Sequence, residues 1–82
     1  MQWQEIRNYY PHQWLLVEAI KAHSEAGKRS VEDFTVINIY PDSKVAMKGY
    51  SQIHQEKPNR ELYVLHTERE NLEITERVGR LL

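Results

Sequence analysis

The chain has 82 residues, of which 40% are hydrophobic and 28% charged, and its formal net charge is −1. These values predict one small globular domain over residues 1–82, and the near-neutral charge argues against a dedicated nucleic-acid binder. The absence of cysteine excludes disulfides, thiolate metal ligands and a cysteine nucleophile. Because no signal-like or membrane-length apolar segment occurs in the sequence, we expect a cytoplasmic protein with no membrane partner.

The first predicted element is a short helix over residues 2–10. Trp3, Ile6 and Tyr10 lie at i, i+3 and i+7, which places them on one helical face. Pro11 ends the helix, since the residue before a proline is pushed out of the α region. We expect the aromatic face of this helix to pack on the sheet that follows.

Two interpretations fit residues 14–23. A period of two gives a strand with apolar residues on both faces, as in the centre of a sheet. A period of 3.6 gives an equally good helical stripe, made of Leu15, Leu16, Ala19, Ile20 and His23. The bulky opening Trp14–Val17 and the turn-like Ser24–Lys28 favour the strand, which we adopt.

A second strand is predicted over residues 29–40, and Pro41 ends it. Alternation places one set of side chains, Phe34, Val36 and Tyr40, on one face. The other face receives Thr35, Ile37 and Ile39. The pair Glu32-Asp33 interrupts this alternation and indicates a β-bulge.

The next element is a helix that Asp42 or Ser43 caps and that runs to about Lys57. Its sheet-facing stripe is predicted to consist of Ala46, Gly49, Tyr50 and Ile53. A glycine inside a helix costs about 1 kcal/mol relative to alanine. We therefore expect Gly49 to permit a close approach between the helix and the backbone of a strand.

The third strand is predicted over Glu61–Thr67, with Leu62 and Val64 on one face and Tyr63 and Leu65 on the other. The core then spans about residues 3–67. Residues 68–82 form a charged C-terminal tail or, since Thr67-x-x-Glu70 fits a capping box, a short helix.

These elements predict an α+β fold: a short N-terminal helix followed by β-β-α-β. A right-handed crossover through the second helix makes the third strand parallel to the second. The first strand then lies between them. The result is a three-stranded, mainly antiparallel sheet of order 2-1-3 with one helix packed on it.

No catalytic, cofactor-binding or metal-binding residue can be assigned from a motif. The four histidines, His12, His23, His54 and His66, lack the local spacing of a metal site. The end of the third strand, at His66 and Thr67 before Glu68, is where ligands bind in many α/β folds and suggests an acid–base pair. The interpretation that we favour is a plain strand end at which Thr67 caps the next turn.

Glu18 interrupts the apolar first strand. A carboxylate in such a place needs a charged partner or a raised pKa. We expect an ion pair with Lys21, Arg29 or Arg60.

Eight aromatic residues, two Trp, five Tyr and one Phe, are many for one small core. Trp and Tyr are enriched in protein interfaces. The candidate interaction or ligand surface is therefore Trp14, Tyr40, Tyr63, His66 and Thr67. The alternative is that the aromatics serve only to pack the core.

Several short sequence stretches resemble a group of small uncharacterised bacterial proteins, domains of unknown function with a Tyr-Pro-x-x-Trp entry to a strand. In chain order the stretches are Trp3-Gln4-Glu5-Ile6, Tyr10-Pro11-x-x-Trp14 with the following Leu15-Leu16-Val17-Glu18-Ala19, Asp42-Ser43 with Ala46 and Tyr50, Pro58, Arg60-Glu61-Leu62-Tyr63-Val64 and His66-Thr67. The resemblance covers nearly the whole chain. It implies a cytoplasmic bacterial protein with a strand–strand–helix–strand core, and it carries no activity and no functional residues.

The leading hypothesis is a non-enzymatic protein–protein interaction or accessory module, with a homodimer as the simplest arrangement, joined through sheet edges or an apolar face. One alternative is a small ligand-binding or enzymatic domain with its site near His66, Thr67 and Glu68. Another is a nucleic-acid binder or toxin–antitoxin component, for which the charge gives little support.

Overall fold

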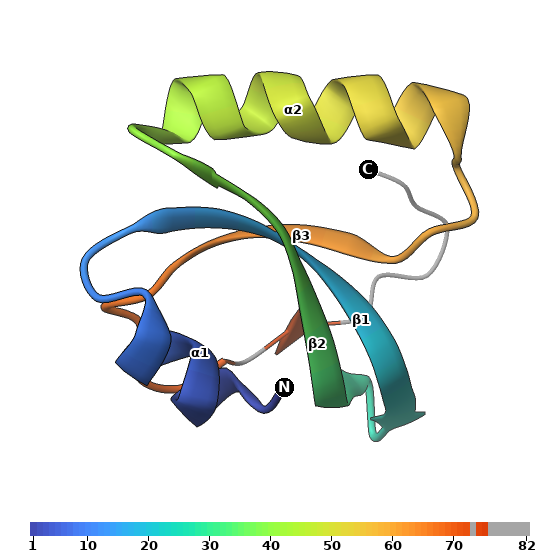
Figure 1. Ribbon diagram of the computed structural model, residues 1–82. Coiled ribbons are helices and arrows are strands. Elements are labelled where there is room, and N and C mark those ends of the chain that lie inside the picture. The colour runs from blue at the N-terminus through green and yellow to red at the C-terminus, as the bar shows by residue number, and fades with distance from the viewer. Residues whose placement is uncertain (73, 76–82) are drawn as a thin grey trace.

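The predicted α+β architecture is confirmed in a computed structural model that describes residues 1–72, 74 and 75 (Figure 1). The elements in chain order are α1 (Trp3–Tyr9), β1 (Trp14–Glu25), β2 (Lys28–Tyr40), α2 (Ser43–Glu56), β3 (Leu62–His66) and β4 (Ile74–Thr75). The sheet has the order β3-β1-β2-β4, and all neighbouring strands are antiparallel. The crossover through α2 thus places β3 parallel to β2, with β1 between them as predicted.

The strand interpretation of residues 14–23 is confirmed. The side chains of Leu15, Leu16 and Val17 are fully buried, although successive side chains of a strand point to opposite faces. Both faces are covered at this end of the sheet, because α2 lies over one face and α1 lies under the other (Figure 1). A strand between two helical layers needs the two apolar faces that made its sequence ambiguous.

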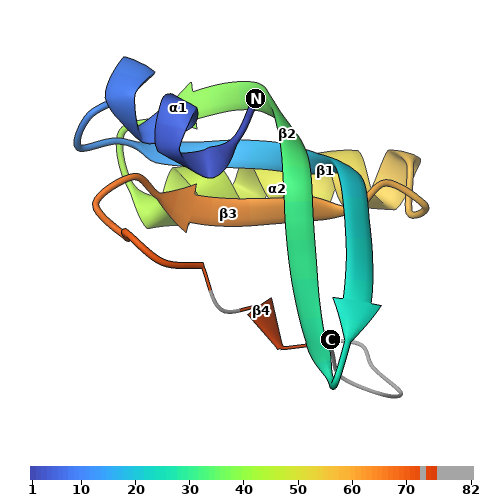
Figure 2. The same ribbon diagram turned by 90° about the horizontal axis from the view of Figure 1, so that it is seen from below.

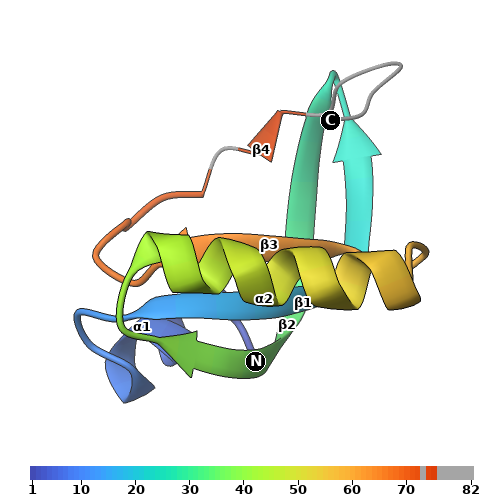
Figure 3. The same cartoon turned by 90° about the horizontal axis from the view of Figure 1, so that it is seen from above.

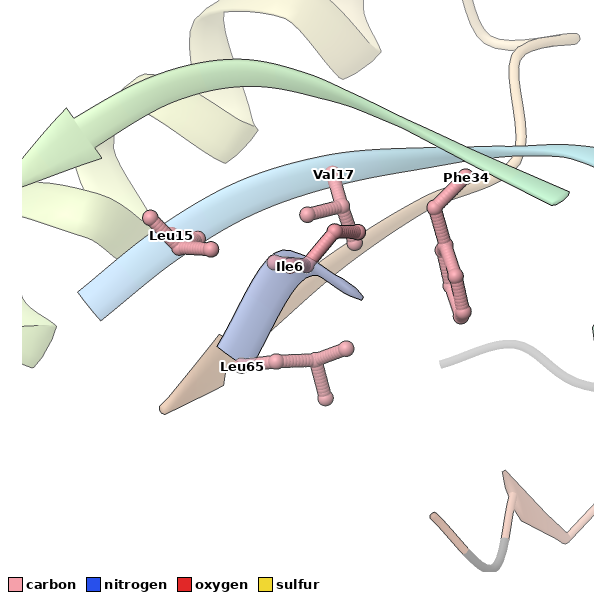
Figure 4. Packing of buried hydrophobic residues seen from close by; sticks show 5 residues of the cluster. All are labelled: Ile6, Leu15, Val17, Phe34 and Leu65. Atoms are coloured by element: carbon pink, nitrogen blue, oxygen red, sulfur yellow. The ribbon is translucent and has the colours of Figure 1, made fainter. Parts of the chain in front are cut away.

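The face under the sheet holds the main core. Figure 4 shows how its side chains converge from α1, β1, β2 and β3; they are Ile6, Leu15, Val17, Phe34 and Leu65. Trp3 and Tyr10 pack against this cluster, so the predicted aromatic face of the N-terminal helix is confirmed. A bond from the Gln2 N–H to the Glu5 carboxylate, 2.9 Å long, satisfies a donor at the start of α1.

The face above the sheet is covered by α2, which runs along β1 and β3 (Figure 3). Asp42 caps the helix as predicted, since its carboxylate accepts the Val45 N–H at 2.9 Å. Gly49 does face a close neighbour, but the prediction of a nearby strand backbone is wrong. A Cβ at Gly49 would lie 2.1 Å from the Tyr40 hydroxyl oxygen, so the neighbour is a side chain.

The predicted face of Tyr40 is also wrong, and a β-bulge is the reason. Leu16 pairs with Asn38 while Val17 pairs with Val36, so one β2 residue between them has no partner. This insertion reverses the alternation for the rest of β2. Tyr40 therefore lies opposite Trp14, on the α2 side, away from the core under the sheet.

The far half of the β1–β2 hairpin turns away from the helices (Figure 2). Register shifts accompany this bend at Ile20 and Glu32, and the second of them confirms the bulge predicted at Glu32-Asp33. The hairpin closes through Ala26 and Gly27, whose φ values are +52° and +77°. Such a pair of left-handed residues matches the twist of a tight two-residue hairpin.

The segment after β3, predicted as a charged tail or a short helix, forms no helix in its described residues. Its described part, residues 68–72, 74 and 75, contains a turn and then the short strand β4, which pairs with Lys28 and Arg29 of β2. Residues 73 and 76–82 lie outside the described residues.

Candidate functional site

Three of the predicted surface residues lie in one row across the sheet. Trp14 is the partner of Tyr40 on one side and of His66 on the other, so all three side chains lie on the α2 side. The Trp14 and His66 rings meet edge to face, with centroids 5.0 Å apart and planes at 77°. The row is half-buried between β2, β1 and β3.

Thr67 does not join that row. It is only 3% exposed, and its hydroxyl accepts the Gln13 N–H at 2.9 Å, while its own N–H donates to the Gln13 carbonyl at 3.0 Å. The Thr67 carbonyl accepts a bond from Arg7 Nε at 2.8 Å. Thr67 therefore ties the end of β3 to the start of β1 and to α1, and its hydroxyl is bound to Gln13 instead of capping the next turn.

The suggested acid–base pair is not assembled at His66. Its Nδ1 accepts the backbone N–H of Glu68 at 3.1 Å, and it lies 3.8 Å from the Glu68 carboxylate, too far for a hydrogen bond. That carboxylate contacts His12 Nδ1 instead, at 2.8 Å, on an exposed surface. In the part of the chain that the structure describes, no three His, Asp or Glu side chains form a group suited to a metal ion.

Tyr63 belongs to a separate polar cluster on the α1 side. Its hydroxyl donates to Glu61, and Arg29 donates to the same carboxylate from Nε at 2.9 Å and from Nη2 at 2.8 Å. Burial and the bond to Glu61 raise the pKa of Tyr63 above its ordinary value of 10.0. The bonds from Arg29 lower the pKa of Glu61. This cluster holds the bent hairpin against β3.

The predicted ion pair of Glu18 is present. Its partner is Arg60, one of the three expected candidates, and the hydrogen bond from Arg60 lowers the pKa of Glu18. Sequence reasoning missed that Arg29 bonds to Glu61 instead. The interrupted alternation at Glu32-Asp33 indicated a bulge there, but it did not indicate that the resulting bend carries Arg29 to β3.

The ladder between β1 and β3 fixes which peptide groups of β3 point outward. The Thr67 N–H donates to the Gln13 carbonyl at 3.0 Å, and at the other end the Ala19 N–H donates to the Glu61 carbonyl at 2.9 Å. Bonding and non-bonding positions alternate along an antiparallel strand. The odd-numbered residues of segment 61–67 therefore bond to β1, and the even-numbered residues point their peptide groups away from the sheet.

The outward-pointing residues of β3 are Leu62, Val64 and His66. The His66 carbonyl accepts the Arg69 N–H at 3.1 Å and is thereby satisfied. Within the described residues, the N–H groups of all three and the carbonyls of Leu62 and Val64 have no backbone partner. As far as the described residues show, the outer edge of β3 therefore carries no backbone pairing at Leu62 and Val64.

The outer edge of β2 is different, since it is covered at several points. Lys28 and Arg29 pair with β4. Phe34 exchanges two backbone bonds with Met1, 2.7 and 2.8 Å long. The Ile39 N–H is taken by the side chain of the preceding Asn38 at 2.9 Å. Bulges and covering segments are devices that protect edge strands from unwanted pairing.

Comparisons with family models, curated proteins and solved structures find no match to this chain. The resemblance to small uncharacterised bacterial proteins stays a prediction. Among the described residues, no helix is long and apolar enough to cross a membrane.

Proposed function

We propose that this chain is a non-enzymatic protein–protein interaction module that binds an extended strand at the outer edge of β3. The observation that supports the proposal is the contrast between the two edges of the sheet. Met1, β4 and bulges cover the β2 edge, whereas the outward peptide groups of Leu62 and Val64 have no backbone partner among the described residues. A row of such groups is a template for adding a strand.

The residues of β3 also suit this role. Leu62–His66 is of ordinary strand length and carries no proline, lysine or carboxylate, and its pairing to β1 is free of register shifts. Its large β-prone side chains favour pairing. The half-buried side chains of Val64 and His66, on the α2 side of β3, would pack against the side chains of an incoming strand.

Proline at position 64 tests the proposal, because the Val64 N–H points away from β1. Val64→Pro removes that donor and leaves the ladder inside the chain intact. Ile39→Pro is the matched control. Ile39 pairs with Leu15, which bonds to β3, so its N–H also points outward, but at the β2 edge.

The readouts are the mass from light scattering at low and high protein concentration and capture of proteins from a bacterial lysate, with circular dichroism to confirm folding. We expect Val64→Pro to lose the association that the wild type shows and Ile39→Pro to keep it. Association that survives in Val64→Pro, or a wild type that neither self-associates nor captures a partner, would contradict the proposal.

A further inference from the structure

We infer that the strand bound at the β3 edge is β3 of a second copy of this chain, antiparallel, with Val64 of both copies facing each other across a two-fold axis. The inference rests on the proposed function and names its partner. It follows from how the residues of Leu62–His66 match themselves in that register.

In this register the outward peptide groups of the two β3 strands face each other. With Val64 on the axis, Val64 faces Val64 and Leu62 faces His66, so outward groups meet outward groups. The central pair exchanges two hydrogen bonds. At each end the His66 N–H donates to the Leu62 carbonyl, while the His66 carbonyl stays with Arg69. The total is about four new backbone bonds.

The side chains match as well. On the α2 side the central Val64 pair is flanked by Leu62 facing His66, and on the α1 side Tyr63 faces Leu65. Aromatic, aliphatic and β-branched cross-strand pairs stabilise a sheet, and like charges directly opposite destabilise it. Moving the axis to Tyr63 would place the Glu61 carboxylate opposite Leu65. The register about Val64 avoids that mismatch.

Charges at the strand ends favour the same arrangement. The chain turns directly after His66, so the ladder ends there; Arg60, just before β3 of one copy, then lies near Glu68, just after β3 of the other, at both ends of the pair. Within each chain Glu68 contacts His12 and Arg60 bonds to Glu18. The Glu68 side chain is nevertheless 62% exposed, so its carboxylate can also face Arg60 of a second copy. Opposite charges at both ends help to fix register and partner choice. An unrelated peptide would need to reproduce this pattern to compete.

Only a residue on the two-fold axis faces the same residue of the other copy, so Val64 can be tested by changes of charge. In Val64→Lys two lysines would oppose each other, and in Val64→Glu two glutamates would. Both long side chains can carry their charge to the open edge. We expect each variant alone to be monomeric at a concentration at which the wild type is dimeric, and their equimolar mixture to form a dimer with one chain of each.

Ile39→Lys and Ile39→Glu are the matched controls, and each should dimerise alone like the wild type. A second, exposed variant guards against misfolding at position 64. Glu68→Lys should raise the dimer dissociation constant about ten-fold, because it replaces attraction to Arg60 by repulsion twice per dimer. Glu70→Lys, the same charge change outside the register, should have little effect.

The outcomes separate the two proposals. A wild-type dimer that Val64→Pro abolishes, but that the Lys and Glu variants do not re-form on mixing, would overturn the register and leave the β3 edge as the binding site. A wild type that stays monomeric and captures another protein through an edge sensitive to Val64→Pro would overturn the second copy and retain the interaction module. Association unaffected by Val64→Pro would overturn both.

Discussion

Thr67→Val is the substitution that most directly separates a structural role from a ligand-binding role at the end of β3. Thr67 is 3% exposed, and its hydroxyl accepts the Gln13 N–H at 2.9 Å. Valine has nearly the same shape, so the change removes the acceptor without opening a cavity. The Gln13 N–H is left without its partner at the point where β1 begins.

The magnitude follows from that unpaired donor. A buried donor that loses its partner costs about 1–3 kcal/mol. This bond is only partly buried, so we expect the lower part of that range, about 1–2 kcal/mol. In a domain of this size, 1 kcal/mol corresponds to roughly 4–8 °C in Tm, which predicts a decrease of about 4–16 °C.

Thermal and urea unfolding followed by circular dichroism measure the effect. Thr67→Ser is the matched control, since it keeps the hydroxyl and loses only a methyl group; it should retain most of the stability that Thr67→Val loses. A Thr67→Val protein that melts within about 2 °C of the wild type would refute the structural role.

Two further predictions concern the polar cluster and the α2 contact. Arg29 lowers the pKa of Glu61 below its ordinary value of 4.5. The ionised Glu61 therefore stabilises the folded state fully above pH 4.5, and this contribution is lost as the pH falls through the folded-state pKa. Unfolding from about pH 5 to 3 should show a smaller loss of stability in Glu61→Gln than in the wild type, and equal losses would refute this. Gly49→Ala should destabilise the wild type, because the new Cβ meets the Tyr40 ring. In a Tyr40→Ala background Gly49→Ala should stabilise through helix propensity, and additive effects would contradict the contact.

The order of elements was predictable because local signals agreed. Pro11 and Pro41 lie just after α1 and β2, and Asp42 caps α2. The two apolar faces of β1 were the one ambiguity. The structure explains them, because β1 lies between two strands and has a helix on each face (Figure 1), so both of its faces are buried.

Details that depend on register were beyond the sequence. Ile37, which has no partner on β1, reverses the face of Tyr40. An isoleucine in a strand gives no sign of a bulge, so this could not be predicted. The strand β4 is only two residues long, so pairing with β2 defines it more than its own composition does.

The candidate site shows the same limit. The aromatic residues that were grouped by type divide in space, with Trp14 and Tyr40 above the sheet and Tyr63 in a cluster with Glu61. Thr67 bonds to a residue 54 positions away, a contact without any local pattern. Two sheet edges could be foreseen from strand order, but which of them is covered depends on such distant contacts.

Amide hydrogen exchange of β3 at low and high protein concentration tests directly whether its outer edge is free in one chain and paired in the assembly. In dilute protein, the Val64 and His66 N–H groups should exchange quickly, while those of Tyr63 and Leu65, which bond to β1, stay protected. At high concentration the Val64 and His66 N–H groups, which donate to the second copy, should become protected too. Protection that is the same at both concentrations, whether high or low, would contradict an open edge that binds a second strand.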